Sequence, residues 1–176
     1  MNKIDKKRKF VSINIAILTI SDSRTIDNDF SGNFLEERII NSGHSVHKKK
    51  IIRDDLYIIK KSLLSFALNK KIDAIISTGG TGITGRDSTP EAILDISDKI
   101  IEGFGELFRQ ISFKKIGTST IQSRALGAVI KGTYVFALPG SKSACKDAWD
   151  QILKYQLDNR YRPCNFIELI PRLKEV

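Results

Sequence analysis

The stretch IDAIISTGGTGITGRDSTPEA, residues 72–92, places a short apolar run, a glycine-rich loop and a helix start in immediate succession. The apolar run at 72–77 is typical of a strand that helices cover on both faces. Pro90 suits the first helical position, where its missing N–H has no partner to lose, and Thr89 is predicted to cap the helix. Strand, loop and helix in this order predict one unit of an α/β sheet.

The same alternation continues along the rest of the chain. Apolar, β-branched runs predict further strands at 13–20 and 133–138, and the segment at 46–52, although basic, is interpreted as another strand. Apolar residues at helical spacing predict helices at 30–42, 57–68, 102–113, 120–129 and 143–157. We expect the helix at 102–113 to be interrupted near Gly103 and Gly105, and the tail from residue 160 to be irregular and peripheral. The pattern therefore predicts an α/β fold: a single-domain, three-layer, doubly wound and mostly parallel sheet.

The length and the charge of the chain limit which domain organisation and which class of partner are possible. A chain of 176 residues fits one domain. We place that domain at 13–176 and expect residues 1–12, which are basic, to form a flexible N-terminus. The net charge is +9, yet the lysines are dispersed and no aromatic residues alternate with them. This pattern indicates a solvated, lysine-rich surface rather than a base-stacking platform, so we expect no nucleic acid partner.

The apolar runs and the N-terminus indicate the compartment. Residues 1–10 are charged and lack the apolar core of a secretory signal. The longest apolar runs are much shorter than the ~20 residues that span a bilayer, so no membrane association is expected. We predict a cytoplasmic protein in which Cys145 and Cys164 stay reduced. Cys145 and Trp149 lie within a predicted helix and are expected in the core, whereas His44 and His47 are expected to have surface roles.

Polar and glycine residues gather after the four predicted strands. Parallel strands end at one edge of their sheet, and ligands of such sheets bind outside those ends. The loops at 21–32, 54–55, 78–87 and 139–143 are therefore expected to converge on a common cleft.

The loop at 78–87 is the sharpest signal for a ligand. Its glycines let backbone N–H groups approach an anion closely and its threonines add hydroxyl donors, which is typical of a phosphate site. Gly80, Gly82 and Gly85 formally match GxGxxG, but the loop follows the third predicted strand, and no acidic residue ends a strand about 20 residues later. The Gly-Lys-Ser/Thr of a Walker A loop is also missing. A tight strand-to-helix turn without a ligand is the alternative.

Carboxylates end the same loops. Asp54 and Asp87, with Asp22 and Asp29, are expected to face the cleft, where they would repel a phosphate unless a cation lies between. Mg²⁺ fits this role because it takes one or two carboxylates together with substrate phosphates. Asp55 is instead predicted to cap the helix that follows it. Neighbouring hydroxyl residues compete for the cap of the helix after Asp87, which leaves Asp87 free to act on a ligand.

Six segments together resemble the MoaB/MogA family of molybdenum cofactor biosynthesis proteins. They are ILTISDSR at 17–24, DFSG at 29–32, STGGTGITGRDSTPEA at 77–92, EGFGELFRQIS at 102–112, GTSTIQSRALGAV at 117–129 and FALPGSKSAC at 136–145. The series TGGTG, RDxTPEA, GFGE and LPGS is highly specific. NRYRPCNF at 159–166 resembles the MoaB-like branch, as does Ser141-Lys142-Ser143, where MogA-like members tend to have a second proline.

This resemblance implies a MogA-like fold that assembles as a homotrimer or as a dimer of trimers. It implies molybdopterin, a pterin with a dithiolene and a terminal phosphate, as the substrate, with ATP as co-substrate and Mg²⁺. The implied reaction adenylylates the terminal phosphate and releases pyrophosphate. A separate molybdate-inserting enzyme is the protein partner that the resemblance implies.

The family's motifs also assign roles to residues of this chain. Asp87 and Asp54 match positions associated with the reaction, and Asp87 is assigned to Mg²⁺. The pterin and nucleotide positions match three loops: Ser21, Asp22, Ser31 and Gly32 in the first, Thr78, Gly79, Gly80, Thr81 and Gly82 in the second, and Pro139, Gly140 and Ser141 in the last.

Three functions stay open from the sequence. The leading one is an adenylyltransferase that acts on molybdopterin, which the presence of Asp87 and Asp54 favours. The second is a non-catalytic carrier of molybdopterin in the same pathway. The third is a general nucleotide or RNA binder that depends on the charge of +9.

Overall fold

The computed structural model, which describes residues 4–175, has one six-stranded sheet in the order β2-β1-β3-β6-β5-β4. Four neighbouring strands run parallel: β2 (Ser45–Ile52), β1 (Asn14–Ile20), β3 (Ala74–Thr78) and β6 (Thr133–Leu138). Two further strands are β5 (Leu126–Ile130), antiparallel to β6, and β4 (Lys99–Ile101), antiparallel to β5. The predicted mostly parallel sheet is confirmed.

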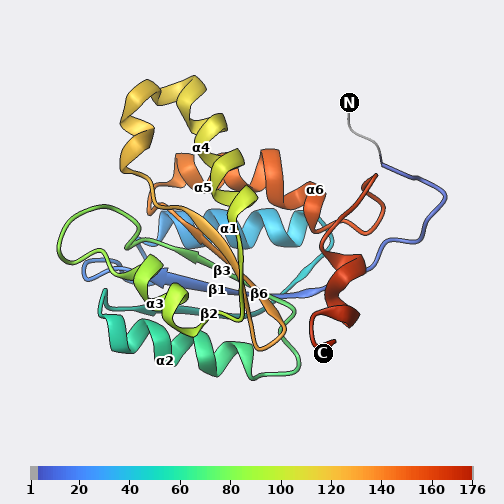
Figure 1. Cartoon of the computed structure of the whole chain (residues 1–176), viewed down its shortest axis with the longest axis horizontal. Coiled ribbons are helices and arrows are strands. Elements are labelled where there is room, and N and C mark those ends of the chain that lie inside the picture. The colour runs from blue at the N-terminus through green and yellow to red at the C-terminus, as the bar shows by residue number, and fades with distance from the viewer. Residues whose placement is uncertain (1–3, 176) are drawn as a thin grey trace.

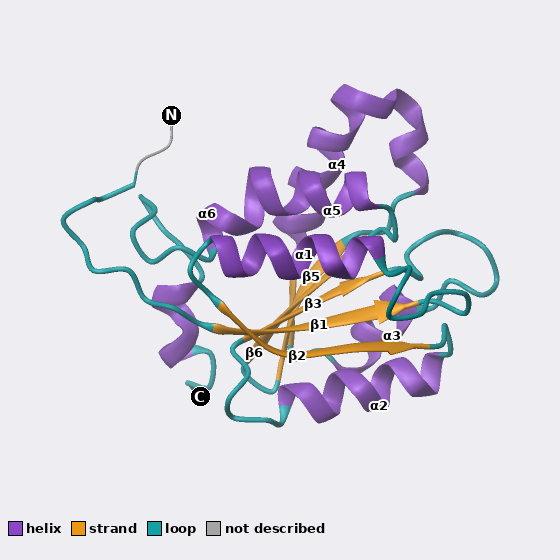
Figure 2. Cartoon of the chain, turned by 180° about the vertical axis from the view of Figure 1, so that it is seen from behind, coloured by secondary structure: helices purple, strands orange, loops and turns teal. Residues whose placement is uncertain are grey.

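Helices cover both faces of the sheet and give three layers (Figure 1). One face carries α1 (Phe30–Asn41), α4 (Glu102–Ile116) and a continuous helix made of α5 (Lys142–Ala148), the π-helical η2 (Trp149–Leu153) and α6 (Lys154–Gln156). Figure 2 shows α2 (Leu56–Ala67) and α3 (Thr89–Ile96) on the opposite face. The 3₁₀ segments η1 (Gly117–Gln122) and η3 (Ile167–Arg172) follow α4 and α6 in the chain.

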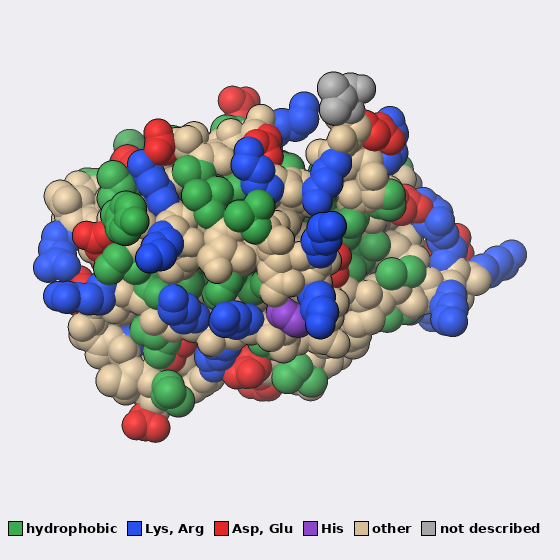
Figure 3. Space-filling model, turned by 90° about the horizontal axis from the view of Figure 1, so that it is seen from below, with side chains coloured by type: hydrophobic (Ala, Val, Ile, Leu, Met, Phe, Trp, Pro, Cys, Tyr) green, Lys and Arg blue, Asp and Glu red, His purple; other side chains and the backbone are tan. Residues whose placement is uncertain are grey.

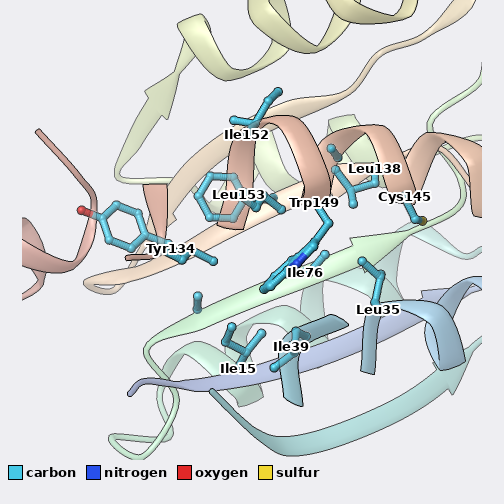
Figure 4. Packing of buried hydrophobic residues seen from close by; sticks show 14 of the residues in the cluster. Ile15, Leu35, Ile39, Ile76, Tyr134, Leu138, Cys145, Trp149, Ile152 and Leu153 are labelled. Carbon is cyan, nitrogen blue, oxygen red and sulfur yellow. The ribbon is translucent and has the colours of Figure 1, made fainter. Parts of the chain in front are cut away.

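Each face of the sheet has its own apolar core. Ile15 and Ile17 of β1 belong to the core beneath α1 and α5, whereas Ala16 and Leu18 belong to the core beneath α2 and α3. Alternate residues of a strand point to opposite faces, so one continuous apolar run supplies both cores. Trp149 is 1% exposed, and Figure 4 shows its side chain extending from the helix toward β3. The core positions predicted for Trp149 and Cys145 are confirmed.

The predicted helix at 120–129 is wrong. Residues up to Gln122 form η1, and the apolar residues that follow form β5, paired between β4 and β6. Lys131 and Gly132 have φ angles of 51° and 77°, as the two central residues of a tight β-hairpin require. A short apolar run is compatible with a strand or a buried helix, and here strand pairing decides between them.

The predicted interruption of the helix at 102–113 is wrong. α4 is continuous through Gly103 and Gly105. A Cβ at Gly105 would lie 2.5 Å from the Ala125 carbonyl oxygen, so this glycine permits close packing rather than a break. The predicted helix at 143–157 is confirmed and begins one residue earlier, at Lys142. Its cap is Ser141, whose side chain accepts a hydrogen bond from the Ala144 N–H.

The tail packs on the core instead of lying loose at the periphery. η3 contains buried Ile167, and the Phe166 and Tyr134 ring centroids are 4.9 Å apart. The N-terminal segment contacts this tail: the Asp5 N–H donates to the Arg160 carbonyl at 2.9 Å. The division into residues 1–12 and a domain at 13–176 stays a prediction, of which residues 1–3 and 176 lie outside the described residues.

No helix within residues 4–175 combines the length and the apolar character that crossing a membrane requires. Lys and Arg side chains are spread over the face seen in Figure 3, with acidic and hydrophobic side chains between them. This face fits the dispersed positive charge expected from the sequence.

The predicted surface role of His44 is wrong, because its side chain is buried. The Ile13 N–H donates to His44 Nδ1 at 3.3 Å, and the Phe10 ring lies 5.1 Å away between centroids. Burial lowers the pKa of His44 below its ordinary value, although the charge of Asp158 and a backbone hydrogen bond at Leu157 act in the opposite direction.

We expect the free energy of unfolding to decrease as the pH is lowered below 6.5, the ordinary pKa of histidine. The unfolded chain then binds a proton at His44 more readily than the folded chain does, so protonation favours unfolding. Above that pH both states are neutral at His44, and its pH-dependent effect disappears. Denaturant titrations between pH 8 and pH 5 of the wild type and His44→Gln measure this. An equal pH dependence in both proteins would contradict it.

Candidate functional site

The carboxyl ends of the parallel strands meet at one edge of the sheet. Thr19 pairs with Thr78, Thr78 pairs with Leu138, and Ile20 pairs with Ile52. The loops after these four strands therefore start at the same level. This register brings the predicted loops 21–32, 54–55, 78–87 and 139–143 together.

A cavity of about 480 Å³ lies between two of these loops and the segment formed by α4 and η1. Its lining includes Gly79, Gly80, Thr81, Gly82, Asp87, Pro139, Gly140 and Ser141, all predicted site residues. The opposite wall was not predicted and consists of Phe108, Ser112, Ile116, Ser119, Gln122 and Ser123. The wall combines apolar surface with hydroxyl and amide groups, which suits a flat ligand with polar edges.

Two glycines let the loop backbone lie closer to neighbouring atoms than a residue with a side chain would allow. Gly79 has a φ of 106°, and a Cβ there would lie 2.1 Å from the Ile20 carbonyl oxygen. Gly80 has a φ of 63°, and a Cβ there would lie 2.4 Å from Thr89 Oγ1 and 2.8 Å from Asp54 Oδ2. The loop backbone therefore lies directly against the end of β1 and the loop after β2.

Hydroxyl groups join the glycine loop to its neighbours. Thr78 Oγ1 donates to the Pro139 carbonyl at 3.0 Å, and Thr89 Oγ1 donates to the Gly79 carbonyl at 2.9 Å. Of Ser88 and Thr89, which compete in the sequence for the cap of α3, Ser88 holds the capping position and Thr89 is the first residue of the helix. Gly79 and Thr78 are held by hydroxyl groups from two elements, which fixes the loop before any ligand binds.

The first loop contributes to the same framework. Ser31 Oγ donates to the Gly140 carbonyl at 2.8 Å, and the Gly32 N–H donates to Asp29 Oδ1, the N-cap of α1, at 2.9 Å. A second cavity of about 210 Å³ lies on this side and is lined by Thr19, Ile20, Ser21, Ser23, Arg24, Asp29, Ser31, Thr78 and Gly140. Gly140 lines both cavities.

We expect Ser31→Ala to lower the free energy of unfolding by about 1 kcal/mol, because the Gly140 carbonyl loses its hydroxyl partner. Denaturant unfolding measures the effect, with Ser143→Ala, at an exposed serine in the first turn of α5, as the control. Equal stability of the two variants would show that the Ser31 hydroxyl does not hold this loop.

Asp22 and Asp54 lie beside the glycine loop rather than in the larger cavity. Asp22 forms ion pairs with Arg86 at 2.6 Å and with Arg53 at 3.7 Å. These three residues, together with Asp54, Asp55 and Ile58, line a cavity of about 210 Å³. Asp55 accepts a hydrogen bond from the Ile58 N–H at 2.9 Å, which confirms its predicted capping role.

The Asp54 carboxylate is one of the two candidate catalytic carboxylates, and its pKa is raised from its ordinary value. Ser88 Oγ donates to Asp54 Oδ1 at 3.1 Å. Burial raises the pKa of Asp54, the hydrogen bonds from Ser88 oppose the rise, and the negative charges of Asp87 and Asp22 add to it. A positive charge near Asp54 would therefore favour its ionised form.

Asp87 lies between the larger cavity and another of about 400 Å³. Its Oδ2 accepts hydrogen bonds from the Thr84 N–H at 2.9 Å and from Thr84 Oγ1 at 2.6 Å. Burial alone would raise the pKa of Asp87, but bonds from Thr84 and Gly82 and the charge of Arg124 outweigh it and lower the pKa. The carboxylate is thus held ionised, and it is bonded within its own loop rather than unengaged.

The carboxylates suit a divalent cation only together with oxygen atoms from a ligand. Within residues 4–175, no group of three or more His, Cys, Asp or Glu side chains is placed to hold a metal ion. Mg²⁺ commonly uses one or two carboxylates and completes its shell with phosphates and water. Asp54 and Asp87, which disfavour each other's charge, fit that arrangement.

The sequence reasoning also missed Arg124. Its guanidinium reaches the glycine loop and α3 from the start of β5, and its Nε donates to the Gly82 carbonyl at 2.6 Å. The segment at 117–129 carried part of the family resemblance, but nothing in its pattern assigned a role to this arginine.

The chain is similar to known proteins over most of its length. Residues 16–159 match the family model described as "Probable molybdopterin binding domain". The chain is 44% identical over 158 residues to the Molybdenum cofactor biosynthesis protein B of Escherichia coli (strain K12), which covers 90% of this chain and 93% of that protein.

Solved structures resemble the whole architecture. A crystal structure of Molybdenum cofactor biosynthesis protein B has a TM-score of 0.86 and 35% identity, covering 96% of this chain and 100% of that one. The tungsten cofactor synthesizing protein MoaB from Pyrococcus furiosus has a TM-score of 0.77 and 30% identity, with 93% and 98% covered.

Proposed function

Since the chain belongs to the molybdopterin-binding family of molybdenum cofactor biosynthesis proteins, we propose that it adenylylates the terminal phosphate of molybdopterin with Mg-ATP. One observation carries the proposal: the Asp87 carboxylate lines the same cavity as the glycine loop. A phosphate held by that loop would lie next to an ionised carboxylate. Such a pair calls for a divalent cation, as phosphoryl-transfer chemistry does.

The proposed reaction needs no nucleophile from the protein. An oxygen of the molybdopterin phosphate attacks the α-phosphorus of ATP. The bond from that phosphorus to the oxygen bridging to the β-phosphate breaks, and pyrophosphate leaves with the electron pair. The protein contributes positioning and charge stabilisation, which supply most of the catalysis in this class of reaction.

Individual residues take the following roles in this proposal. Gly79, Gly80 and Gly82 would present backbone to the phosphate, and the wall from Phe108 to Ser123 would take the pterin. Asp87 and Asp54 would hold Mg²⁺, which neutralises charge on the nucleotide phosphates when bound. The rest of the pterin and nucleotide site would be formed by Ser21, Asp22, Ser31, Gly32, Thr78, Thr81, Pro139, Gly140 and Ser141.

Assembly, partner and compartment belong to the same proposal. Exposed apolar side chains on α4 and η1, including Phe113 and Ile121, support self-association, for which the family resemblance implies a homotrimer or a dimer of trimers. The product would pass to a molybdate-inserting enzyme in the cytoplasm.

The test is the formation of adenylylated molybdopterin from authentic molybdopterin and Mg-ATP, with pyrophosphate release measured in parallel. Product and pyrophosphate in equal amounts, dependent on Mg²⁺, are the expected result. Tight molybdopterin binding without either product would support a carrier instead. The hydrogen bonds from Thr84 to Asp87 are the observation that favours this second function, because they engage the carboxylate.

The nucleic acid alternative is tested by salt. Affinity for RNA that depends on phosphate contacts should fall steeply with ionic strength. We expect only weak binding at low salt, since the Lys and Arg side chains on the face seen in Figure 3 are interspersed with acidic and hydrophobic side chains.

A further inference from the structure

The Arg124 guanidinium binds both ends of the exposed turn, residues 83–86, that follows the first glycines of the loop. Arg124 Nε donates to the Gly82 carbonyl at 2.6 Å, and Nη2 donates to the Asp87 carbonyl at 2.8 Å. Its Nη1 forms an ion pair with Glu91 of α3. The Arg124 backbone N–H donates to the Thr81 carbonyl at 3.1 Å. The side chain and backbone of one residue thus bind four positions between residues 81 and 91.

The turn between these anchors has little else in the core to hold it. Residues 83–86 are exposed, and the Ile83 side chain is turned to solvent with 66% of its surface accessible. Thr84 and Asp87 close the turn on itself through the hydrogen bonds to Asp87 Oδ2. Those bonds shape the turn but do not place it relative to the sheet. Two contacts do: Arg86, within the turn, forms an exposed ion pair with Asp22 of the loop after β1. Arg124 extends from the start of β5, binds both ends of the turn and also contacts α3.

We propose that Arg124 is a positioning residue that holds Asp87 and Gly82 at the rim of the cavity. The inference rests on the proposed function, in which Asp87 acts on the ligand phosphates. A guanidinium presents its N–H groups in a rigid plane and can serve three acceptors at once. A lysine ammonium keeps the charge but is a point donor on a flexible stem, so it would not reproduce this arrangement.

Arg109 provides a matched control. It lies on α4, and its Nη1 donates to the carbonyl of Ala125, the neighbour of Arg124, at 3.0 Å. This bond joins α4 to the same stretch of chain but ends outside the 81–88 loop. If loss of any arginine at this junction loosened the site, Arg109→Ala would have the same effect as Arg124→Ala.

The experiment compares the wild type with Arg124→Ala, Arg124→Lys and Arg109→Ala in two measurements. The first is kcat and KM for adenylate formation. We expect Arg124→Ala to lower kcat about 100-fold, as a small misplacement of a reacting group does, with the KM for molybdopterin changed much less. The second is backbone amide hydrogen exchange at residues 82–88, which should lose protection in both Arg124 variants and keep it in Arg109→Ala.

Each other outcome overturns the proposal in a distinct way. Full activity in Arg124→Lys would show that charge alone matters, and a raised KM with unchanged kcat would show a uniform binding contact. Equal effects of Arg124→Ala and Arg109→Ala would show general loosening. If the wild type forms no adenylate, the proposed function fails, and amide exchange decides the role of Arg124: unchanged protection at 82–88 in Arg124→Ala and Arg124→Lys would exclude it. If Arg124→Ala does not fold, Arg124→Lys decides in the same way.

Discussion

Replacing Asp87 by alanine should lower kcat for adenylate formation at least about 100-fold while molybdopterin still binds, because one charged group at a phosphoryl-transfer centre contributes on that scale. Gly79, Gly80 and Gly140 line the cavity without help from Asp87, so the phosphate subsite survives the change. Loss of a negative charge beside that subsite also removes repulsion of the anionic ligand. Steady-state kinetics and equilibrium binding, measured on the same preparations, give both quantities.

Asp87→Asn is the matched control for this experiment. An amide oxygen can still accept the hydrogen bonds that Thr84 donates to Asp87, so the turn keeps its shape while the charge is lost. We expect Asn to be as inactive as Ala. Wild-type activity in Asp87→Asn would show that the carboxylate serves only to close the turn.

The second large effect is expected at Gly79. Gly79→Ala should lower the free energy of unfolding by about 2–3 kcal/mol or more, because a residue with a side chain is strained at a φ of 106°. The added Cβ would also lie 2.1 Å from the Ile20 carbonyl oxygen, a backbone atom that moves only with β1. Denaturant unfolding measures the stability, and calorimetric titration with molybdopterin measures the expected loss of binding.

Gly85→Ala tests whether this effect depends on position. Gly85 lies in the same loop, but a Cβ there would meet no atom within 4 Å. We expect its stability to stay within about 0.5 kcal/mol of the wild type. If Gly79→Ala and Gly85→Ala were equally stable, the close approach of the glycine loop to β1 would have no energetic role.

The parallel part of the sheet was predictable because burial on both faces leaves a clear pattern. β1, β3 and β6 are continuous apolar runs, and each is followed by polar or glycine residues. The sequence pattern predicts a helix where β5 lies, because a run of five mostly apolar residues is compatible with both a helix and a strand. β4 is only three residues long and gave no signal. These two strands depend on pairing with distant neighbours, which local patterns do not encode.

The candidate site likewise has a part that could be predicted from the sequence and a part that could not. The convergence of the strand-end loops follows from parallel topology, so Gly79, Asp54 and Gly140 were placed near one another from the sequence. The wall contributed by Phe108 and Ser123 was not found, because it depends on how α4 and η1 fold back over the sheet edge. Arg124 is 37 residues from Asp87, and charge alone does not distinguish it among the chain's many basic residues.

The position of Gly140 matters for any ligand that extends beyond one of the two cavities that this residue lines. It lines both the cavity that contains the glycine loop and the smaller one beside Ser21 and Ser31. A ligand that occupied both cavities would therefore pass a residue that carries no side chain. The Ser31 hydroxyl donates a hydrogen bond to the Gly140 carbonyl and so holds this shared residue in position.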